Sequence, residues 1–504
     1  MRHIPLALAL VLVSSLAFAG PPTRRVCTHG STRCFAHVRA DAAAAGFTPQ
    51  DLWAAYSIDP NIKTTPTVAI VDAYGYPDLE ADLATYRAQF GLPACTTASG
   101  CLAILNEKGQ KSPLPGSSPS GDDWTVETAL DVDMISAACP LCKIVVVQSD
   151  NEQSLFAAQL AAAAANPTVI SDSWGGAEQG NEASYESYFD HPGIAQFASS
   201  GDSGWDDGGM GPVYPSTSAH VIAVGGTSLY KDGSARGFSE AAWTGAGSSC
   251  SGSIAKPSYQ GNTSCSRKAT ADISAVADPA TGMYVYNSAQ GGWLVVGGTS
   301  AASPLVASMF AASGLGSVTA AQIAQSATSV LHDVTQGSNG SCGTILCNAG
   351  SGWDGPTGYG TPNAAALAGG MSGGGGGGTL AVAITSPADG ATVPEMFQIT
   401  ATSTGASVVG AFVDGVEIGQ TATGPYAFTA PHMGPGPHVV TVVAEDAAGD
   451  QSQAMVQVVV TEPPPSADTG DASQAAGCAA GGGTPGLAIV LLLTLAARRT
   501  PRAR

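Results

Sequence analysis

The clearest chemical feature of the sequence is a serine at the junction of a strand and a helix. Ser300 lies in Gly-Gly-Thr-Ser-Ala-Ala-Ser-Pro (297–304), after the strand-like residues 293–296 and before a helical pattern over 301–312. At the N-terminus of a helix, free backbone N–H groups and the helix dipole favour negative charge that develops during a reaction. Pro304 fits there because N–H groups in the first turn have no helical partners. The pattern predicts that Ser300 is a nucleophile.

A serine nucleophile needs a general base, and the sequence offers carboxylates for this role. Glu127 and Asp131 are four residues apart in a predicted helix over 124–134, so their side chains share one face. Their neighbours are apolar, and adjacent carboxylates in a half-buried setting raise each other's pKa and titrate as a pair. Such a pair suits general-base catalysis in acid. The alternative interpretation is an exposed acidic face of the helix.

A histidine base, as subtilisin-type peptidases use, has no good candidate in this sequence. Of the eight histidines, only His29 has a similar context, His-Gly-Ser-Thr, and it precedes the first predicted core strand. We interpret the similarity of the His29 context to that of a catalytic histidine as a coincidence. Two aspartates follow strand-like segments: Asp72 comes after 67–71, and Asp202 lies in Ser-Gly-Asp-Ser-Gly after 194–198. Taken alone, Asp202 indicates a turn.

Glu127, Asp131, Asp202 and Ser300 follow one another along the chain in the order found in the sedolisins, which are serine-carboxyl peptidases. The sequence around them resembles that family. The resemblance covers residues 51–365. Its further motifs are Ser-x-Ser-Trp-Gly (171–175), Tyr-Pro (214–215), Ala-Val-Gly-Gly-Thr (223–227) and Gly-x-Gly-Trp-Asp (350–354). The resemblance implies a peptidase that cuts peptide bonds through an acyl-enzyme.

The resemblance also implies a division of roles among the candidate residues. Glu127 takes the proton from Ser300, and Asp131 orients and supports Glu127. Asp202, in its protonated form, donates a hydrogen bond to the oxyanion, and Asp72 has a supporting position beside this set. A carboxylic acid donates only while it is protonated, and an unperturbed carboxylate has a pKa near about 4, so we expect an acidic pH optimum.

Binding sites for substrate and calcium are implied as well. The edge formed by Ser173, Trp174 and Gly175 is expected to bind the backbone of a protein or peptide substrate. One Ca²⁺ is expected between two loops, since calcium prefers hard oxygen ligands. The implied ligands are the side chains of Asp333 and Asp354 and the main-chain carbonyls of Val334, Gly350 and Gly352. The alternative is a pair of ordinary Gly/Asp turns.

The segments that position these residues alternate between strand and helix patterns over 51–370. The strand-like runs lie at 67–71, 143–147, 168–171, 194–198 and 221–224, and helical patterns lie at 79–90 and 154–165. This alternation predicts an α/β domain with a parallel sheet and helices on both faces, and the resemblance makes it subtilisin-like. Sites in such sheets lie beyond the carboxyl ends of the strands.

A different pattern follows a glycine linker at 371–378. Residues 379–461 contain short strand-like runs with turns between them and no helix pattern, which predicts an all-β, immunoglobulin-like sandwich. The segment resembles bacterial Ig-like modules through Ser-Pro-Ala-Asp-Gly-Ala-Thr (386–392). We expect a spacer or binding role for it.

Both ends of the chain and its cysteines indicate export. Residues 1–19 have the pattern of a signal peptide, and residues 20–50 form a short leader. Residues 462–476 predict a disordered linker, and residues 477–504 resemble the C-terminal sorting tails of myxobacterial surface proteins, with a plain membrane anchor as the alternative. Ten of the eleven cysteines form close pairs, which predicts disulfides in an oxidising compartment: Cys27/Cys34, Cys95/Cys101, Cys139/Cys142, Cys250/Cys265 and Cys342/Cys347.

Composition narrows the class of function. The net charge is -20 with only 12% charged residues, which argues against nucleic acid because phosphate binding needs clustered Lys and Arg. We expect a monomer, secreted or at the cell surface or outer envelope, that meets the membrane only through its tail. The alternatives are a catalytically silent surface adhesin on a peptidase fold and a subtilisin-type serine peptidase. The leader is far shorter than the prodomain that sedolisins usually carry, so the mode of activation stays open.

Overall fold

The computed structural model describes residues 22–40, 45–261, 263–371, 380–414, 416–445 and 451–461. These residues form two compact units, with the boundary between Gly374 and Gly375. The predicted signal peptide, most of the glycine linker, the linker 462–476 and the tail 477–504 lie outside the described residues.

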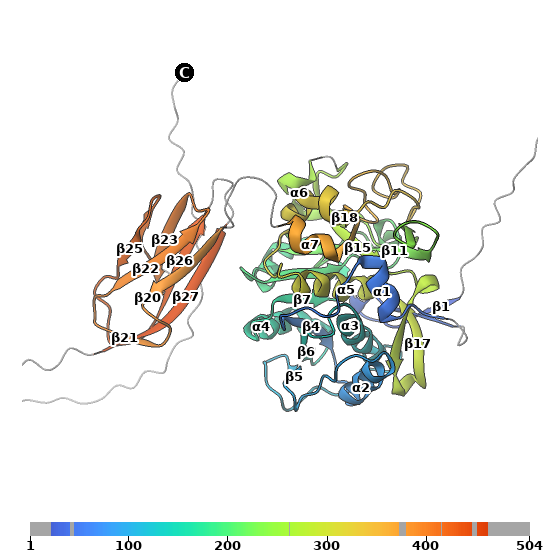
Figure 1. The fold of residues 1–504 in the computed structure, drawn as a ribbon, viewed down its shortest axis with the longest axis horizontal. Coiled ribbons are helices and arrows are strands. Elements are labelled where there is room, and N and C mark those ends of the chain that lie inside the picture. Colours follow the sequence, from blue (N-terminus) through green and yellow to red (C-terminus); the bar gives the residue numbers. More distant parts are fainter. Residues whose placement is uncertain are drawn as a thin grey trace, which may run out of the picture. The chain divides into compact units, whose positions relative to one another are not determined.

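A mostly parallel sheet of eight strands forms the centre of the first unit (Figure 1). Its strand order is β12-β11-β9-β7-β4-β6-β5, with β15 beside β11, and β12 runs antiparallel to β11. The strands are β4 (Thr67–Ala73), β5 (Leu102–Asn106), β6 (Lys143–Ser149), β7 (Val169–Asp172), β9 (Ala195–Ser199), β11 (Val221–Lys231), β12 (Phe238–Ala242) and β15 (Ile273–Val276). The strand-like runs predicted between 67 and 224 are confirmed, because their apolar, β-branched residues suit a buried parallel sheet.

Helices pack against this sheet and against each other. They are α1 (Pro49–Tyr56), α2 (Leu79–Gln89), α3 (Trp124–Ala138), α4 (Leu155–Ala164), α5 (Thr299–Ala312), α6 (Ala320–Val330) and α7 (Ala364–Gly370). α4 lies against β4 and β6, whereas α3 and α5 pack on each other and on β4. Every residue of α3 except Thr125 is buried, so this helix runs through the core. The alternative of an exposed acidic face on this helix is excluded.

The described leader residues form strands that belong to the first unit. The leader strands are β1 (Thr23–Arg25), β2 (Thr32–Cys34) and β3 (His37–Arg39). Their partners outside the leader are β8 (Trp174–Ala177) and β17 (Gly292–Gly297). β1 pairs with β3, β3 pairs with β17, and β2 pairs with β8, all antiparallel. Backbone hydrogen bonds therefore tie the described leader residues to the same compact unit as the sheet.

Smaller elements and five disulfides complete the first unit. The strands are β10 (Val213–Tyr214), β13 (Ser249–Ala255), β14 (Arg267–Thr270), β16 (Met283–Asn287), β18 (Leu331–His332) and β19 (Thr361–Pro362). The 3₁₀ helices are Glu152–Ser154, Glu182–Ser184, Glu186–Tyr188, Asp206–Gly209, Ser258–Gln260, Pro279–Thr281 and Ser288–Gln290. All five predicted disulfide pairs are confirmed, and Cys139–Cys142 is a local bridge just after α3.

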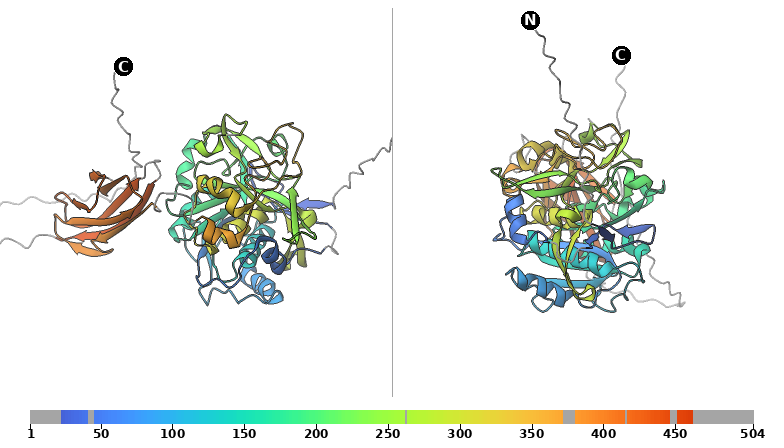
Figure 2. Two further views of the ribbon diagram at one scale, coloured as in Figure 1. Left: turned by 45° about the horizontal axis from the view of Figure 1, so that its top comes forward. Right: turned by 90° about the vertical axis from the view of Figure 1, so that its right-hand side faces the viewer.

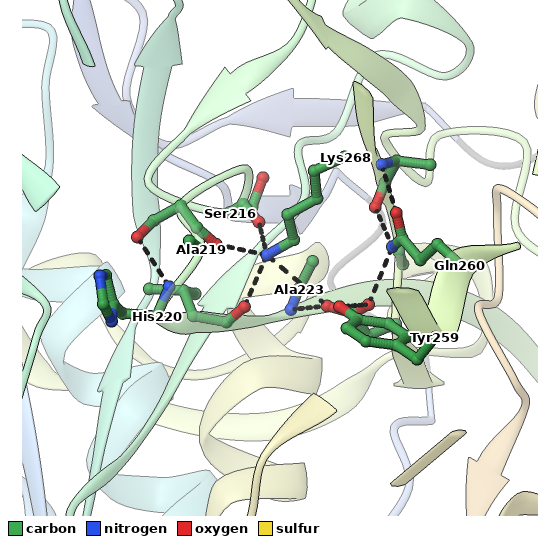
Figure 3. Close-up of polar contacts among 12 residues, drawn as sticks. Ser216, Ala219, His220, Ala223, Tyr259, Gln260 and Lys268 are labelled. Carbon is green, nitrogen blue, oxygen red and sulfur yellow. Dashed lines mark hydrogen bonds and ion pairs between the residues drawn. The ribbon is translucent and has the colours of Figure 1, made fainter. Parts of the chain in front are cut away.

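A buried lysine fixes the loop between β10 and β11 (Figure 3). The Nζ atom of Lys268 lies 3.9 Å from Asp272 Oδ2, and both side chains are almost inaccessible to solvent. The ammonium group also donates to three backbone carbonyls, those of Ser216, Ser218 and Val221. These four oxygen partners satisfy a charge that burial would otherwise make very unfavourable.

Two sheets form the second unit, which Figure 2 shows as strands in orange to red. Their orders are β20-β22-β25 and β21-β27-β26-β23-β24, and they enclose a separate apolar core that includes Ile399 and Val442. The strands are β20 (Ala381–Ser386), β21 (Ala391–Val393), β22 (Gln398–Thr404), β23 (Val408–Val413), β24 (Val416–Thr421), β25 (Tyr426–Thr429), β26 (Gly436–Glu445) and β27 (Gln451–Val460). The predicted sandwich is confirmed. Across the described parts of both units, every helix is too short or too polar to cross a membrane.

Candidate active site

Ser300 lies where β17 turns into α5, as the sequence predicts. Gly298, between the two elements, has a φ of +118°, which favours glycine. A Cβ atom on Gly298 would collide with the carbonyl oxygen of Phe35 and would lie 2.6 Å from Asp202 Oδ2. Glycine therefore keeps open the space in front of the serine.

The polar atoms of Ser300 are held by backbone groups of two other segments. Its hydroxyl donates to the carbonyl of Ser173 at 3.0 Å and accepts from the N–H of Phe35 at 3.0 Å. The N–H of Ser300 donates to the carbonyl oxygen of Phe35 at 3.1 Å. A peptide carbonyl thus already lies within reach of the serine.

The predicted carboxyl pair lies beside Ser300, because α3 packs against α5. Glu127 and Asp131 are fully buried. Asp131 Oδ1 accepts a hydrogen bond from the Ser173 hydroxyl at 2.8 Å, and that hydroxyl lies 3.2 Å from the carbonyl oxygen of Ser300. Neither carboxyl oxygen of Glu127 has a hydrogen-bond partner among the described residues. Buried polar atoms without partners are rare in proteins and are free to engage a reacting group.

Burial raises the pKa of every member of this carboxyl cluster. The pKa of Glu127 lies well above its usual value through burial, which the Ser300 hydroxyl opposes and the charges of Asp72 and Asp202 reinforce. The pKa of Asp131 is also well raised, by burial first and by the charges of Asp72 and Glu127 next. Burial raises the pKa of Asp72, at the end of β4, to about 7. The carboxyls therefore titrate together, and Asp72 lies near enough to take the supporting position expected for it.

Asp202 approaches the same serine from the end of β9. Its Oδ1 accepts from the N–H and the hydroxyl of Thr299 at 2.7 and 2.8 Å. Its Oδ2 has no hydrogen-bond partner in the described part of the chain and borders the space next to the Phe35 carbonyl. Burial raises the pKa of Asp202 to about 7. Below that pH the carboxyl carries a proton that it can donate to a carbonyl oxygen.

The expected substrate edge lies along β8, although its three residues contribute differently. The Ser173 carbonyl accepts from the N–H of Phe35 at 3.2 Å. The Trp174 side chain instead points into the core, where its Nε1 donates to the carbonyl of Val71 at 2.8 Å. A Cβ atom on Gly175 would lie 2.5 Å from Val213 Cγ1 and 3.1 Å from the Phe35 ring. Ser173 and Gly175 therefore contact the leader segment that carries Phe35, and Trp174 offers only its backbone.

The loops expected to bind calcium come together in the structure. Asp333 Oδ2 accepts from the N–H of Gly352, and Asp354 Oδ2 accepts from the N–H of Gly350, both at 3.0 Å. Val334 and Asp354 are buried. Within the described ranges no three His, Cys, Asp or Glu side chains gather closely enough to hold a metal ion. The two carboxylates and nearby carbonyls are nevertheless of the oxygen type that calcium requires.

The structure adds contacts that the sequence did not reveal. The leader reaches the site, where Phe35 contacts Ser300 and His37 Nε2 lies 3.3 Å from Asp202 Oδ2. Strands of three residues contain too few positions for a periodic pattern, so nothing local indicated their partners. His29, whose sequence context we interpreted as coincidental, has its Nδ1 atom 3.3 Å from Asp122 Oδ2.

Comparison with known proteins gives the family of this chain. The subtilase family pattern matches residues 120–371, which is half of the chain. The chain belongs to the subtilase family. The bacterial Ig domain pattern matches residues 381–442, within the second unit. This subtilase-family protein is therefore a peptidase-type unit followed by an Ig-like unit.

Several relatives resemble this subtilase-family protein in its first unit. Kumamolisin of Bacillus sp. (strain MN-32) is 31% identical over 64% of this chain and 63% of its own length. Sedolisin of Pseudomonas sp. (strain 101) is 37% identical over 32% of this chain and 31% of its own length. The solved Pseudomonas sedolisin, a serine-carboxyl proteinase complexed with two molecules of pseudo-iodotyrostatin, has a TM-score of 0.54 at 26% identity and covers 65% of this chain and 98% of that one.

These comparisons show a sedolisin-like α/β peptidase fold for the first unit. The matches span less than two thirds of the length of either curated relative. The activity of the whole protein is therefore argued from the site itself.

Proposed function

We propose that this chain is a secreted or surface-displayed serine-carboxyl peptidase that works best in acid. The observation that carries the proposal is the buried pair Glu127 and Asp131 beside Ser300, where a serine peptidase needs its base. The similarity to a serine-carboxyl proteinase supports the same chemistry. His37 contacts Asp202 rather than Ser300, so a histidine-based mechanism gains no support from it.

The proposed reaction gives each residue one role. Ser300 Oγ attacks the carbonyl carbon of the substrate while Glu127 accepts the hydroxyl proton, and Asp131 stabilises Glu127 by sharing protons within the cluster. The N–H of Ser300 and the protonated Asp202 bind the oxyanion. A donor of this kind contributes roughly 3–4 kcal/mol to transition-state stabilisation in serine peptidases. The amine then leaves with a proton, and water hydrolyses the acyl-enzyme.

The pKa shifts set the two limbs of the proposed pH profile. The pKa of Asp202 is raised to about 7, so its donor form is present below pH 7 and disappears as the pH rises through that value. The raised pKa of Glu127 means that its base form is lost as the pH falls. Activity should therefore follow a bell-shaped profile that declines on the alkaline side near pH 7.

One Ca²⁺ is proposed to bind between the loops that carry Asp333 and Asp354. Their carboxylates would be joined by the carbonyls of Val334, Gly350 and Gly352, and water would complete the six to eight oxygen ligands that calcium takes. The proximity of the two carboxylates to the same glycine-rich turn supports this. Excess EDTA should lower the melting temperature of the wild-type chain, and Asp333→Asn should remove that response.

Export and surface location are proposed from the disulfides, which persist in oxidising compartments. The partners would be proteins or peptides, bound by a monomer whose membrane contact is limited to the tail. The Ig-like unit would act as a spacer or binding module.

The test is hydrolysis of denatured casein by the full chain between pH 2.5 and 8, after incubation in acid. We expect activity that peaks in acid, is abolished by Ser300→Ala and survives in Ser313→Ala, a matched change at the other end of α5. Full activity at pH 8 with none at pH 4 would contradict the carboxylate mechanism. A folded, calcium-loaded chain that hydrolyses nothing would favour the adhesin.

A further inference from the structure

A buried carboxyl at the end of β7 lies next to the residue that holds Ser300. Asp172 is the last residue of β7, it precedes Ser173, and its side chain is fully buried. Its Oδ1 accepts a hydrogen bond from the side-chain Nε2 of Gln159, which is fully buried in α4. Asp172 Oδ2 and Gln159 Oε1 have no hydrogen-bond partner among the residues that the structure describes. Buried polar groups are usually satisfied, so a pair with one open oxygen on each member requires an explanation.

Helices hold this part of the chain from both faces. Successive side chains of a strand point to opposite faces of the sheet. On one face, Ser171 Oγ lies 2.8 Å from Ser303 Oγ of α5. On the other face, Asp172 contacts α4, and the Trp174 ring packs edge-on against Phe156 of α4 at 5.4 Å between centroids. Asp172 therefore supplies the polar contact on the α4 face.

Ser173, the next residue along the chain, holds two groups of the active site. Its hydroxyl donates to Asp131 Oδ1 at 2.8 Å, and its carbonyl accepts from Ser300 Oγ at 3.0 Å. A movement of this backbone therefore moves the serine hydroxyl and the carboxyl pair together. Misplacing a reacting group by about 1 Å can cost on the order of 10² in rate. The contact between Asp172 and α4 thus acts on Ser300 through one peptide unit.

We propose that Asp172 is a positioning residue for Ser300 that holds this backbone in acid, as a neutral carboxylic acid paired with Gln159, and holds it less well as the pH rises. A proton on Oδ2 gives the carboxyl a donor for Gln159 Oε1, so acid and amide complement each other in two hydrogen bonds. Loss of that proton leaves a buried charge with a single hydrogen bond, which is unfavourable. The inference rests on the proposed peptidase function for its effect on catalysis alone, since the effect of pH on unfolding requires no catalysis.

The surroundings of Asp172 favour its neutral form. The elements α4, α5 and β9 contain no charged residue, so they offer the carboxyl no cation. The titratable groups whose charges interact with it are other acids, Asp72 of β4 and Asp131 of α3. Burial raises the pKa of Asp172 well above its usual value, the hydrogen bond from Gln159 opposes this rise, and the charge of Asp72 adds to it.

The sign of the pH effect follows from this raised pKa. An aspartate in the unfolded chain has a pKa near about 4, so below that pH the carboxyl is protonated in both states. Above it, the unfolded chain releases the proton and the folded chain retains it. The equilibrium then shifts toward unfolding by up to about tenfold per pH unit, until the folded carboxyl also ionises. Asp172→Asn lacks this dependence, because an amide has a donor and an acceptor at every pH.

The first arm of the test measures stability without catalysis. Urea unfolding is followed by tryptophan fluorescence from pH 4 to 7.5, in the full chain carrying Ser300→Ala, with and without Asp172→Asn. All seven tryptophans lie in the first unit, so the signal reports that unit alone. We expect Asp172→Asn to gain stability over its parent as the pH rises above 4, by up to about tenfold in the unfolding equilibrium per pH unit. Asp150→Asn, an exposed position just after β6, is the matched control and should show no such gain. A difference between parent and Asp172→Asn that stays constant across this range would overturn the inference.

The second arm measures kcat and KM of the full chain at pH 4 with a fluorogenic peptide. Asp172→Leu removes the hydrogen bond to α4 and should lower kcat by about 10- to 100-fold, with a much smaller change in KM. Asp172→Asn should restore kcat. Gln159→Met removes the same hydrogen bond from the α4 side and should act like Asp172→Leu, so one of the two remains informative if the other does not fold.

The outcomes separate this inference from the peptidase function. A wild-type kcat in both Asp172→Leu and Gln159→Met would overturn the positioning role and leave the peptidase function standing. Equal loss of kcat in Asp172→Leu and Asp172→Asn would also overturn it, because the neutral amide should replace the acid. An inactive wild type would contradict the peptidase function, and the urea experiment would still decide whether Asp172 and Gln159 pair in acid.

Discussion

Replacement of Asp202 separates its role as a hydrogen-bond donor from its role as a titrating group. Asn in Asp202→Asn keeps an oxygen for the N–H and hydroxyl of Thr299, which lie 2.7 and 2.8 Å from Oδ1. Its amide nitrogen replaces Oδ2, the oxygen that borders the attacked carbonyl. Unlike a carboxyl, an amide donates at every pH.

The expected magnitudes follow from the pKa of about 7 for Asp202. At pH 8 only about a tenth of the carboxyl is protonated, so the wild type should lose roughly tenfold in kcat through this group. Asp202→Asn should retain its own acid-side kcat at pH 8. Asp202→Ala, which removes the donor, should lose about 10²–10³ in kcat at every pH.

The assay is kcat of the full chain for a fluorogenic peptide from pH 3 to 9. Asp206→Asn, in the loop after Asp202, serves as the matched control and should keep the wild-type profile. An alkaline limb in Asp202→Asn that is identical to the wild-type limb would refute the reasoning. It would mean that another group sets the decline.

Three further changes test the packing around the site. Glu127→Gln should lower kcat by about 10²–10⁴ because the base is lost. Its melting temperature should stay equal or rise, because a neutral amide replaces a buried carboxyl that has no hydrogen-bond partner among the described residues; a lower melting temperature would contradict this. Lys268→Met should destabilise the chain by on the order of 3–5 kcal/mol in urea unfolding, because Asp272 loses its buried counter-charge, and an unchanged midpoint would count against it. Gly175→Ala should lower the melting temperature, because the new Cβ would lie 2.5 Å from Val213 Cγ1 and 3.1 Å from the Phe35 ring; an unchanged melting temperature would count against it.

Local sequence determined the elements that carry most of the chemistry. The Gly-Gly turn before Ser300 predicts the strand-to-helix junction, because a left-handed φ at Gly298 needs glycine. The spacing of Glu127 and Asp131 places them on one helix face whatever surrounds the helix. The apolar runs that became β4, β6, β7, β9 and β11 are strands for equally local reasons.

Tertiary structure decided what these groups can do. The raised pKa values of Glu127 and Asp202 come from burial, which depends on α5 and the sheet packing around them. A turn aspartate such as Asp202 has the same local pattern with or without a serine opposite it, so only the resemblance to sedolisins indicated its role. The route of the leader was also beyond the sequence, because Phe35 meets Ser300 across 265 residues of chain. Short strands find such distant partners through backbone hydrogen bonds, which carry no side-chain signature.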